Sequence, residues 1–469
     1  SVLFAARGDL LVYGMGENQT REIAARLAKG EPIHSLTDIK GTCYQTPDIT
    51  GLRGLRLPSL EQVRKDKCLY AKAAKTELDE NDYITGKRLF QEQETGFLVC
   101  NPPMPPLTTQ ELDEVYALPF MKYYHPVYEN QGGIAAIEEV EFSITHNRGC
   151  FSGCNFCALA FHQGRSVTSR SPNSVIQEGK ALAANPRFKG YIHDVGGPTA
   201  NYRKPSCEKQ LKSGLCRNKR CLSPSPCDKL EVSHREYLGI LRSLRSIPKV
   251  KKVFVRSGIR FDYLIADRDD SFFKELIEHH ISGQLKVAPE HCSAAVLDKM
   301  GKPHIQSYKK FASKFYQLTK TAGKEQYLVP YLMSSHPGST LKSAVELAVF
   351  LKRENIRPEQ VQDFYPTPGT ISTAMYYTGI NPYSMEPVYV PKTPEEKASQ
   401  RALLQYFLPK NRDKVMEALK KAGRTDLIGS GKDCLVFGSV PQKKTAPGSK
   451  KGKNTGRKAD NGWQGKRKR

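Results

Sequence analysis

ITHNRGCFSGCNFCALAFHQG, residues 144–164, is the segment from which the class of this chain can be argued. It sets Cys150, Cys154 and Cys157 in a C-x3-C-x2-C pattern. Three thiolates this close together suit a soft metal centre, because sulfur ligands select iron–sulfur clusters, zinc or copper(I). Three protein ligands leave one coordination position open, as a catalytic cluster needs. The spacing therefore favours an iron–sulfur cluster with a chemical role.

Two other uses of these thiols compete with a cluster. A disulfide needs an even partner and an oxidising compartment, and the sequence shows no secretory signal. A zinc site normally shows a second C-x2-C pair or a histidine at ligand spacing. His162 follows Cys157 by five residues and keeps zinc open as an alternative.

Length and composition bound the function further. The chain has 469 residues, enough for two or three domains, and twelve cysteines. No apolar run is long enough to span a membrane, so no membrane partner is expected. We expect a cytoplasmic enzyme whose reduced cysteines serve metal binding or catalysis. Because the first apolar run starts abruptly at Ser1, we also expect that an N-terminal portion is missing.

The net charge is strongly positive, 72 − 48 = +24. Residues 441–469 hold eleven Lys and Arg against one acid, Asp460, which gives +10 and leaves about +14 for the rest. Such a tail, with few apolar residues, is predicted to be disordered. Its charge allows a nucleic acid as partner, and equally a solvated tail that binds polyanions without specificity.

Strand and helix patterns alternate from about residue 138 to 368. The predicted strands are EVEFSITH (139–146), YIHDVGGP (191–198), VFVRSG (253–258), GQLKVAPEH (283–291), EQYLVPYLMSS (325–335) and VQDFYPT (361–367). Helical patterns follow them, beginning with SPNSVIQEGKALAAN (171–185), capped at Ser171. Six β/α units predict an α/β fold with a partial (β/α)6 TIM-like barrel, whose site lies at the carboxyl ends of the strands.

The flanking regions complete the predicted domains. Strand 9–15 and helix 17–30 indicate the end of a Rossmann-like domain, followed by a proline-rich connector with NPPMPPL at 101–107. Helical patterns recur at 395–408 and 412–423. The predicted units are residues 1–135 (Rossmann-like end plus connector), 136–380 (barrel), 381–440 (small helical region) and 441–469 (basic tail).

At this point the sequence resembles the radical S-adenosylmethionine (SAM) superfamily, and more narrowly the YgiQ family. The matching stretches are RGCFSGCNFCALAFHQGR, DVGGPTANYRKPSCEKQLKSGLC, VRSGIRFDYL, LKVAPEHCS, YLVPYLMSSHPGS and QDFYPTPGT. The resemblance implies that Cys150, Cys154 and Cys157 hold a [4Fe-4S] cluster whose fourth iron is chelated by SAM. It also implies reductive cleavage of SAM to a 5′-deoxyadenosyl radical, with an electron donor such as flavodoxin or ferredoxin and an unknown substrate.

The resemblance also implies which residues bind SAM. In such enzymes a glycine-rich strand end meets the SAM amino group, and polar residues on later strands meet its carboxylate and ribose. The corresponding cofactor-binding residues here are Phe156, Gly196, Gly197, Pro198, Arg256, Ser257 and Glu290. Pro198 departs from the glutamate that is common in the family. No corrinoid signature occurs in the chain, so cobalamin is not predicted.

A second cysteine group lies in the loop after the second predicted strand. Cys207, Cys216, Cys221 and Cys227 fall within twenty-one residues that show no regular pattern. Metal is the natural way to order four thiolates in such a loop, and both zinc and a second iron–sulfur cluster suit them. Free thiols are the alternative. The other five cysteines are scattered and expected to be buried apolar residues: Cys43, Cys68, Cys100, Cys292 and Cys434.

The sequence therefore leaves three candidate functions. The first is a radical SAM enzyme of unknown substrate. The second is a radical SAM enzyme that modifies RNA or the ribosome, which the net charge suggests. The third is a nucleic-acid-binding protein stabilised by zinc. A cysteine loop placed after the first of six β/α units favours an enzyme over a binding module.

Overall fold

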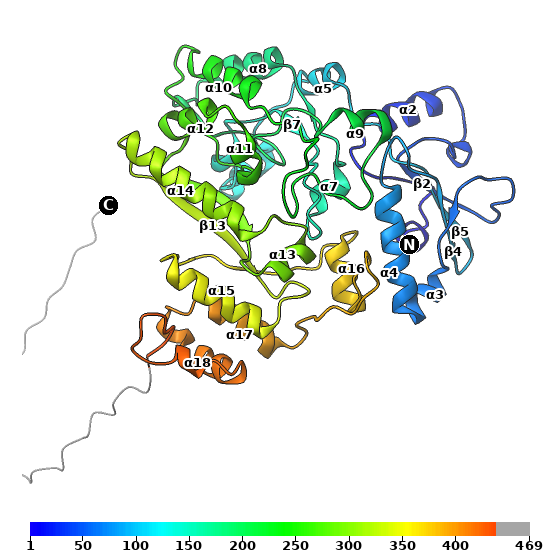
Figure 1. Ribbon diagram of the computed structural model, residues 1–469. Coiled ribbons are helices and arrows are strands. Elements are labelled where there is room, and N and C mark those ends of the chain that lie inside the picture. The colour runs from blue at the N-terminus through cyan, green and yellow to red at the C-terminus, as the bar shows by residue number, and fades with distance from the viewer. Residues whose placement is uncertain (438–469) are drawn as a thin grey trace, which may run out of the picture.

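The computed structural model describes residues 1–437 (Figure 1). The predicted basic tail, residues 441–469, lies outside the described residues. The fold is α/β: a small N-terminal sheet lies beside a larger set of parallel strands and their helices, and a C-terminal group of helices packs below it (Figure 1).

The N-terminal region contains a five-stranded sheet in the order β1-β2-β5-β4-β3. Its strands are β1 (Leu10–Val12), β2 (Thr42–Thr46), β3 (Leu55–Arg56), β4 (Leu89–Gln93) and β5 (Gly96–Cys100). Three of the four strand pairs are antiparallel, and only β3 and β4 run parallel. A small buried cluster of Tyr44, Phe90 and Val99 fills one face of this sheet.

The predicted Rossmann-like unit is wrong in its topology. Strand β1 and helix α2 (Glu17–Ala28) occur where the pattern placed them, but β2 then pairs antiparallel with β1. A βαβ unit requires a parallel pair whose crossover helix covers one face of the sheet. Helix α2 buries only Gln19 and therefore covers no sheet face.

The rest of the region before the parallel strands is helical or irregular. Residues 59–81 form two helices, because Asp66 ends the first and caps the second by accepting from the backbone N–H groups of Cys68 and Leu69. The second of them, α4, contacts α16 (Ile371–Thr378) of the central region. Residues 101–107 form no helix or strand, as predicted. The helices are α1 (Val2–Ala5), α2, α3 (Leu60–Lys65), α4 (Lys67–Glu80), α5 (Thr109–Tyr116) and α6 (Ile137–Val140).

The central region contains the six predicted strands in chain order. They are β6 (Ser143–Thr145), the interrupted pair β9 (Tyr191–Ile192) and β10 (Asp194–Gly196), β11 (Lys252–Val253), β12 (Gln284–Glu290), β13 (Tyr327–Ser334) and β14 (Gln362–Asp363). Parallel pairs join β6 to β10, β9 to β11, β12 to β13 and β13 to β14. Between β11 and β12 no strand pairing occurs within residues 1–437, so closure into a partial barrel stays a prediction.

Helices follow these strands as the sequence pattern indicated. Helix α8 begins at Pro172 because the Ser171 hydroxyl accepts from the backbone N–H of Ser174. The helices of this region are α7 (Ala158–His162), α8 (Pro172–Ala184), α9 (Glu208–Ser213), α10 (Arg235–Arg245), α11 (Phe261–Ala266), α12 (Ser271–Glu275), α13 (Ala294–Met300), α14 (Ile305–Thr321), α15 (Leu341–Arg353) and α16 (Ile371–Thr378). A π-helical turn, Leu276–His280, extends α12.

One large apolar core holds the parallel strands to their helices. Val195, Val253 and Leu285 enter it from three strands, and Tyr237 and Phe311 enter it from α10 and α14. Strands buried in this way read as continuous apolar runs, which is why the sequence placed them correctly. The core fixes the carboxyl ends of the strands relative to one another.

The predicted C-terminal helical region is present but packs on the central region. Helices α17 (Pro394–Leu404) and α18 (Arg412–Lys421) share a second apolar core with α15. Leu347 and Leu351 of α15 meet Leu403 and Leu419 there. The helices on the two sides of the predicted boundary near residue 380 therefore share one apolar core.

His280 makes the stability of the central region depend on pH. Its Nδ1 donates to the Val253 carbonyl at 2.7 Å, its Nε2 is buried without a partner among the described residues, and burial lowers its pKa from 6.5 to about 4. Between these values the unfolded chain binds the extra proton, so stability falls as pH falls from 6.5 toward 4. Urea unfolding of His280→Asn, which retains the donor, is expected to lose less stability than wild type between about pH 7 and pH 5. Equal losses would contradict this assignment.

Candidate metal and cofactor site

The three cysteines of the first group lie on one loop at the end of the first core strand. The loop leaves through β7 (Asn147–Arg148) and returns through β8 (Thr168–Ser169), which pair antiparallel. Gly149 has φ +80°, and a side chain there would collide with the Ser166 carbonyl. The loop is closed by the Cys150 N–H, which donates to the Gly164 carbonyl at 3.0 Å. The sequence RGCFSGCNFC therefore folds as one tight loop.

The three thiols are half-buried and lie within electrostatic reach of one another. Burial, with the charges of Cys154 and Cys150, raises the pKa of the Cys157 thiol to about 11. The Thr199 hydroxyl lies 3.6 Å from Cys150 Sγ. Across residues 1–437, no three His, Cys, Asp or Glu side chains stand in a ready-made metal geometry. The three side chains are of the type that holds a cluster, because iron lowers the pKa of a thiol that it binds and coordinates it as a thiolate.

Arg260 places a positive charge against the cysteine loop, and it was not singled out from the sequence. Its Nη1 donates to Cys154 Sγ at 3.4 Å, and its Nε donates to Asp262 at 2.8 Å. Arg260 is 8% exposed and Asp262 is 1% exposed. A guanidinium held this way stabilises negative charge on the cysteine sulfur.

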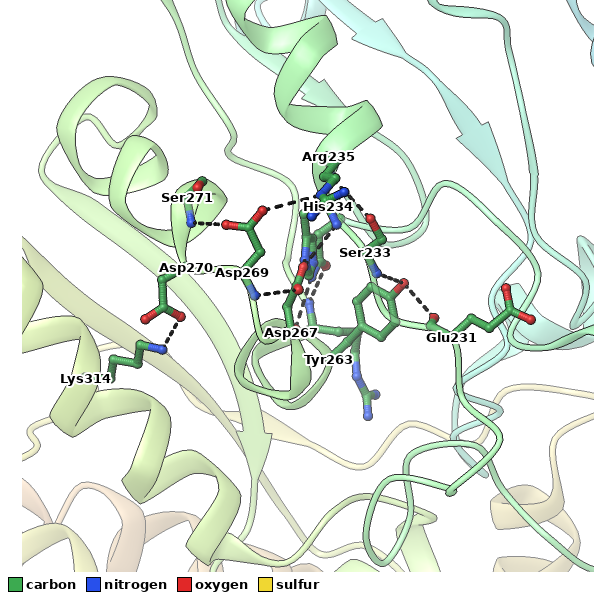
Figure 2. A network of polar contacts seen from close by, with 12 residues as sticks. Glu231, Ser233, His234, Arg235, Tyr263, Asp267, Asp269, Asp270, Ser271 and Lys314 are labelled. Atoms are coloured by element: carbon green, nitrogen blue, oxygen red, sulfur yellow. Dashed lines mark hydrogen bonds and ion pairs between the residues drawn. The ribbon is translucent and has the colours of Figure 1, made fainter.

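A buried polar network holds Arg260 in place, and Figure 2 shows the part of it around His234 and Asp267. Asn201 accepts from the Arg260 backbone N–H at 2.8 Å and donates its amide to His234 Nε2 at 3.0 Å. The other ring nitrogen of His234 lies 2.6 Å from Asp267, and Figure 2 marks this contact with a dashed line. The His234 ring also stacks on Phe272 with its centroid 4.8 Å away. The loop carrying Arg260 is thus tied to the N-terminus of α10 and to the α11–α12 turn.

Gly196, the last residue of β10, and Gly197 after it form a cradle beside the loop. Gly196 is buried, and a methyl group on it would collide with Ser257 Oγ and with Asp194. A methyl group on Gly197 would collide with the Asn147 side-chain oxygen. Ser257 Oγ and Asn147 Oδ1 are buried and have no hydrogen-bond partner among the described residues. Such atoms are costly unless a ligand satisfies them.

The end of the third strand is held beside this cradle by Asp194. Its Oδ1 accepts from the backbone N–H groups of Arg256 at 2.7 Å and Ser257 at 3.1 Å. The Arg256 side chain itself is exposed and pairs with Glu139 at 3.3 Å. Ser257 is therefore placed in the cradle, whereas Arg256 lies on its rim. Pro198 follows the two glycines and is half-buried.

Glu290, at the end of the fourth strand, has a buried carboxylate and a strained backbone. It has φ +67°, which a non-glycine residue adopts at a cost of about 1–3 kcal/mol and which is concentrated at functional sites. Burial raises its pKa, while Lys302, 3.6 Å away, and Arg260 act in the opposite direction. It has the character of a hydrogen-bond acceptor kept away from water.

Phe156 is placed by packing. Its ring meets His336 edge-on at 6.1 Å and lies against the buried cluster of Val296, Leu297 and Met300. His336 is buried and its Nε2 lies 2.6 Å from the Ser372 hydroxyl. Packing therefore fixes the side chain of Phe156.

Two further arginines line a small cavity next to the cysteine loop, and the sequence pattern gave no signal for them. The cavity is lined by Cys154, Cys157, Arg165, Arg220 and Tyr383, among others. Arg220 donates to the Asn155 side chain at 2.5 Å and to Tyr383 at 2.6 Å. Burial and the nearby Arg220 lower the pKa of Arg165. This wall therefore suits an anionic group.

The second cysteine group lies next to the first. Burial raises the pKa of Cys221, whose thiol also feels the charges of Cys207 and Cys216. Lys209 donates to Cys216 Sγ at 3.3 Å, and a hydrogen bond to Cys227 raises the pKa of Lys219. Cys150 and Cys221 pack against the same buried cluster of Phe151, Val167, Tyr202, Leu222 and Tyr263.

The remaining cysteines follow the prediction only in part. Cys43 and Cys292 are buried, whereas Cys100 and Cys434 are half-buried. Cys68 is exposed, so the expectation was wrong there, because the first turn of α4 faces solvent. Cys43 and Cys100 are not scattered in space, since they face each other across β2 and β5.

The family model of the radical SAM N-terminal domain matches residues 1–143, and that of a domain of unknown function, DUF3362, matches residues 359–469. A UPF0313 protein of Clostridium perfringens (strain 13 / Type A) is 54% identical over 438 residues, covering 93% of this chain and 66% of that protein. One of Clostridium botulinum (strain ATCC 19397 / Type A) is 55% identical, covering 93% of this chain and 68% of that protein.

By its match to the radical SAM N-terminal family model, the chain is a radical SAM protein. The chain belongs to the UPF0313 family, the family of the YgiQ type. It spans about two thirds of the length of the curated relatives it matches.

Solved structures show only a weak likeness. The radical SAM methyltransferase TsrM from Kitasatospora setae, with tryptophan and a SAM analogue bound, has TM-score 0.41 and 13% identity, covering 77% of this chain and 52% of that one. The cobalamin-dependent radical SAM enzyme OxsB, with aqua-cobalamin bound, has TM-score 0.48 and 11% identity, covering 92% and 63%. Likeness at this level defines no chemistry for this chain.

No helix among residues 1–437 is both long and apolar enough to cross a bilayer.

Proposed function

We propose that this chain is a radical SAM enzyme of unknown substrate. Cys150, Cys154 and Cys157 would hold a [4Fe-4S] cluster, which when bound supplies the electron that cleaves SAM to methionine and a 5′-deoxyadenosyl radical. The observation that carries the proposal is the glycine cradle with its two unpartnered buried oxygens, Ser257 Oγ and Asn147 Oδ1, at the strand ends beside the cysteine loop.

The chain's own residues divide the work of binding. Gly196 and Gly197 let the Ser257 and Asn147 side chains lie close against the backbone, because neither glycine carries a side chain that would collide with them. Ser257 offers a hydroxyl and Glu290 a buried carboxylate, which suit the amino and hydroxyl groups of SAM. Arg260 offsets negative charge on the Cys154 sulfur. Burial of Glu290 and the surrounding apolar core exclude water from these contacts.

The wider setting is part of the same proposal. We infer that the six β/α units form a partial barrel, with unit boundaries at residues 135, 380 and 440. A cytoplasmic location would keep the cysteines reduced, and flavodoxin or ferredoxin would supply the electron. The basic segment after residue 440 is proposed as a contact for nucleic acid.

Cluster loading tests the first site. After anaerobic reconstitution with iron and sulfide and reduction with dithionite, wild type is expected to show the electron paramagnetic resonance signal of a reduced [4Fe-4S] cluster that changes when SAM is added. Cys154→Ala should lose the SAM-sensitive signal, whereas Cys68→Ala, at an exposed residue outside both cysteine groups, should retain it. A colourless protein that binds zinc through the same thiols would reject the enzyme in favour of a structural zinc site.

A second metal site is proposed at Cys207, Cys216, Cys221 and Cys227. The mutual electrostatic influence of three of these thiols, with lysines bonded to two of the four sulfurs, supports it. Replacing Cys216 and Cys227 together by serine is expected to remove one metal centre while leaving the SAM-sensitive signal of the first. Total iron, sulfide and zinc per chain measure this. Metal content equal to that of wild type would mean that these four are free thiols.

A further inference from the structure

Two cysteines outside both groups face each other across the N-terminal sheet. Cys43 of β2 is directly opposite Cys100 of β5, and their sulfur atoms lie 3.0 Å apart. Cys43 is 7% exposed, and Cys100 is half-buried. Neither residue belongs to the cluster loop or to the second cysteine group.

The register of the two strands brings the pair into disulfide range. The Asn101 N–H donates to the Thr42 carbonyl at 2.9 Å, so residues 42 and 101 form a hydrogen-bonded pair. The next pair, Cys43 and Cys100, is therefore a non-hydrogen-bonded pair. Such pairs have Cα atoms about 4.5 Å apart, and disulfides span Cα distances of about 4.4–6.8 Å. The thiols can join without breaking the ladder.

The pair also forms part of a cavity wall, so a small reagent can reach it. This cavity of about 220 Å³ is lined by Tyr13, Cys43, Glu77, Cys100 and Phe161, among others. Phe161 belongs to α7, which begins directly after Cys157, and its carbonyl accepts from the Asn81 side chain at 3.2 Å. The dithiol therefore faces a cavity that extends to the helix next to the cysteine loop.

We propose that Cys43 and Cys100 form a thiol–disulfide exchange site that reacts with small disulfides. The Cys100 thiolate, on the more accessible residue, attacks one sulfur of the small disulfide and expels a thiolate. The sulfur of Cys43 then attacks the sulfur of Cys100 and expels the second thiolate, which takes up the proton of the Cys43 thiol. Two cysteine thiols are thereby oxidised by two electrons to one cross-strand disulfide, and the small disulfide is reduced to two thiols.

The order of attack follows from the environment of the two sulfurs. The hydrogen bond to Cys100, with burial, raises the pKa of Cys43 far above its usual range. Cys43 is therefore a poor first nucleophile, and it reacts once Cys100 offers it a disulfide bond at contact distance.

Exchange with hydroxyethyl disulfide tests the proposal on the full chain. The reduced protein is treated anaerobically, the remaining thiols are alkylated, and the peptides are mapped by mass spectrometry. The expected result is a loss of both alkylatable thiols at positions 43 and 100, a linked peptide pair lighter by two hydrogens, and reversal by dithiothreitol. Cys68, exposed and without a facing cysteine, should carry only the mixed disulfide.

Two variants keep the result decisive. Cys43→Ser should stop the reaction at a mixed disulfide on Cys100, and Cys68→Ser should leave the 43–100 link unchanged. Full alkylation of Cys43 and Cys100 under conditions that convert Cys68 completely would overturn the proposal. So would an equal yield of the same link from the urea-unfolded chain, because the folded sheet would then play no part.

Discussion

Replacing Arg260 by methionine is expected to lower the free energy of unfolding by about 3–5 kcal/mol, because it leaves a buried carboxylate without its cation. Asp262 is 1% exposed and takes its charge-neutralising hydrogen bonds from Arg260. The same change removes the donor to Cys154 Sγ. Urea unfolding of the reduced, metal-free chain measures the loss of stability, and it should be far larger than for an exposed arginine such as Arg64.

The double variant Arg260→Met with Asp262→Leu separates the two roles of Arg260. Removing both charges should recover most of the stability, since no unpaired ion remains in the core. The contact with Cys154 stays absent, so in both variants the reduction potential of the reconstituted cluster should shift to more negative values. A double variant with wild-type potential would show that Arg260 has no influence on the cysteine loop.

Gly197→Ala is expected to reduce SAM affinity by at least about tenfold, the equivalent of 1.4 kcal/mol. The added methyl group would collide with the Asn147 side chain and come near the Asn147 carbonyl, so the strand end must move and the cradle narrows. Equilibrium binding of SAM to the reconstituted protein measures the effect. The cluster content should remain that of wild type, because the cysteine loop is not changed.

Gly239→Ala is the matched control for this substitution. Gly239 lies within α10, and a methyl group there meets no atom within 4 Å. Alanine in a helix interior should even stabilise by about 0.5–1 kcal/mol. SAM affinity equal to wild type in both variants would exclude Gly197 from the cofactor site.

The elements of the central region could be predicted because their signals are local. Ser171 caps α8, and the buried strands show as apolar runs flanked by helical patterns. The antiparallel pairing of β1 and β2 could not be predicted in this way. The strand and helix patterns of residues 1–45 are compatible with either direction, and the choice is made by β5, which pairs with β2 from more than fifty residues away.

In the candidate site, too, the local features could be predicted and the contacts between distant residues could not. The three cysteines stand in one short motif, so their spacing was visible at once. Arg260 reaches Cys154 across 106 residues of sequence, and the Asn147 oxygen meets Gly197 only after two strands have paired. Arg256 was predicted to bind the cofactor, which stays a prediction, and its side chain lies at the exposed rim beside Glu139. Strand-end position predicted where a residue lies but not which way its side chain points.

Formation of 5′-deoxyadenosine is the measurement that tests the central claim most directly. The chain is reconstituted anaerobically with iron and sulfide, reduced with dithionite and given SAM, with Cys157→Ala and Cys68→Ala assayed in parallel. We expect 5′-deoxyadenosine from wild type and from Cys68→Ala, and none above background from Cys157→Ala. A wild-type protein that carries the cluster and binds SAM but forms no more 5′-deoxyadenosine than Cys157→Ala would contradict this claim.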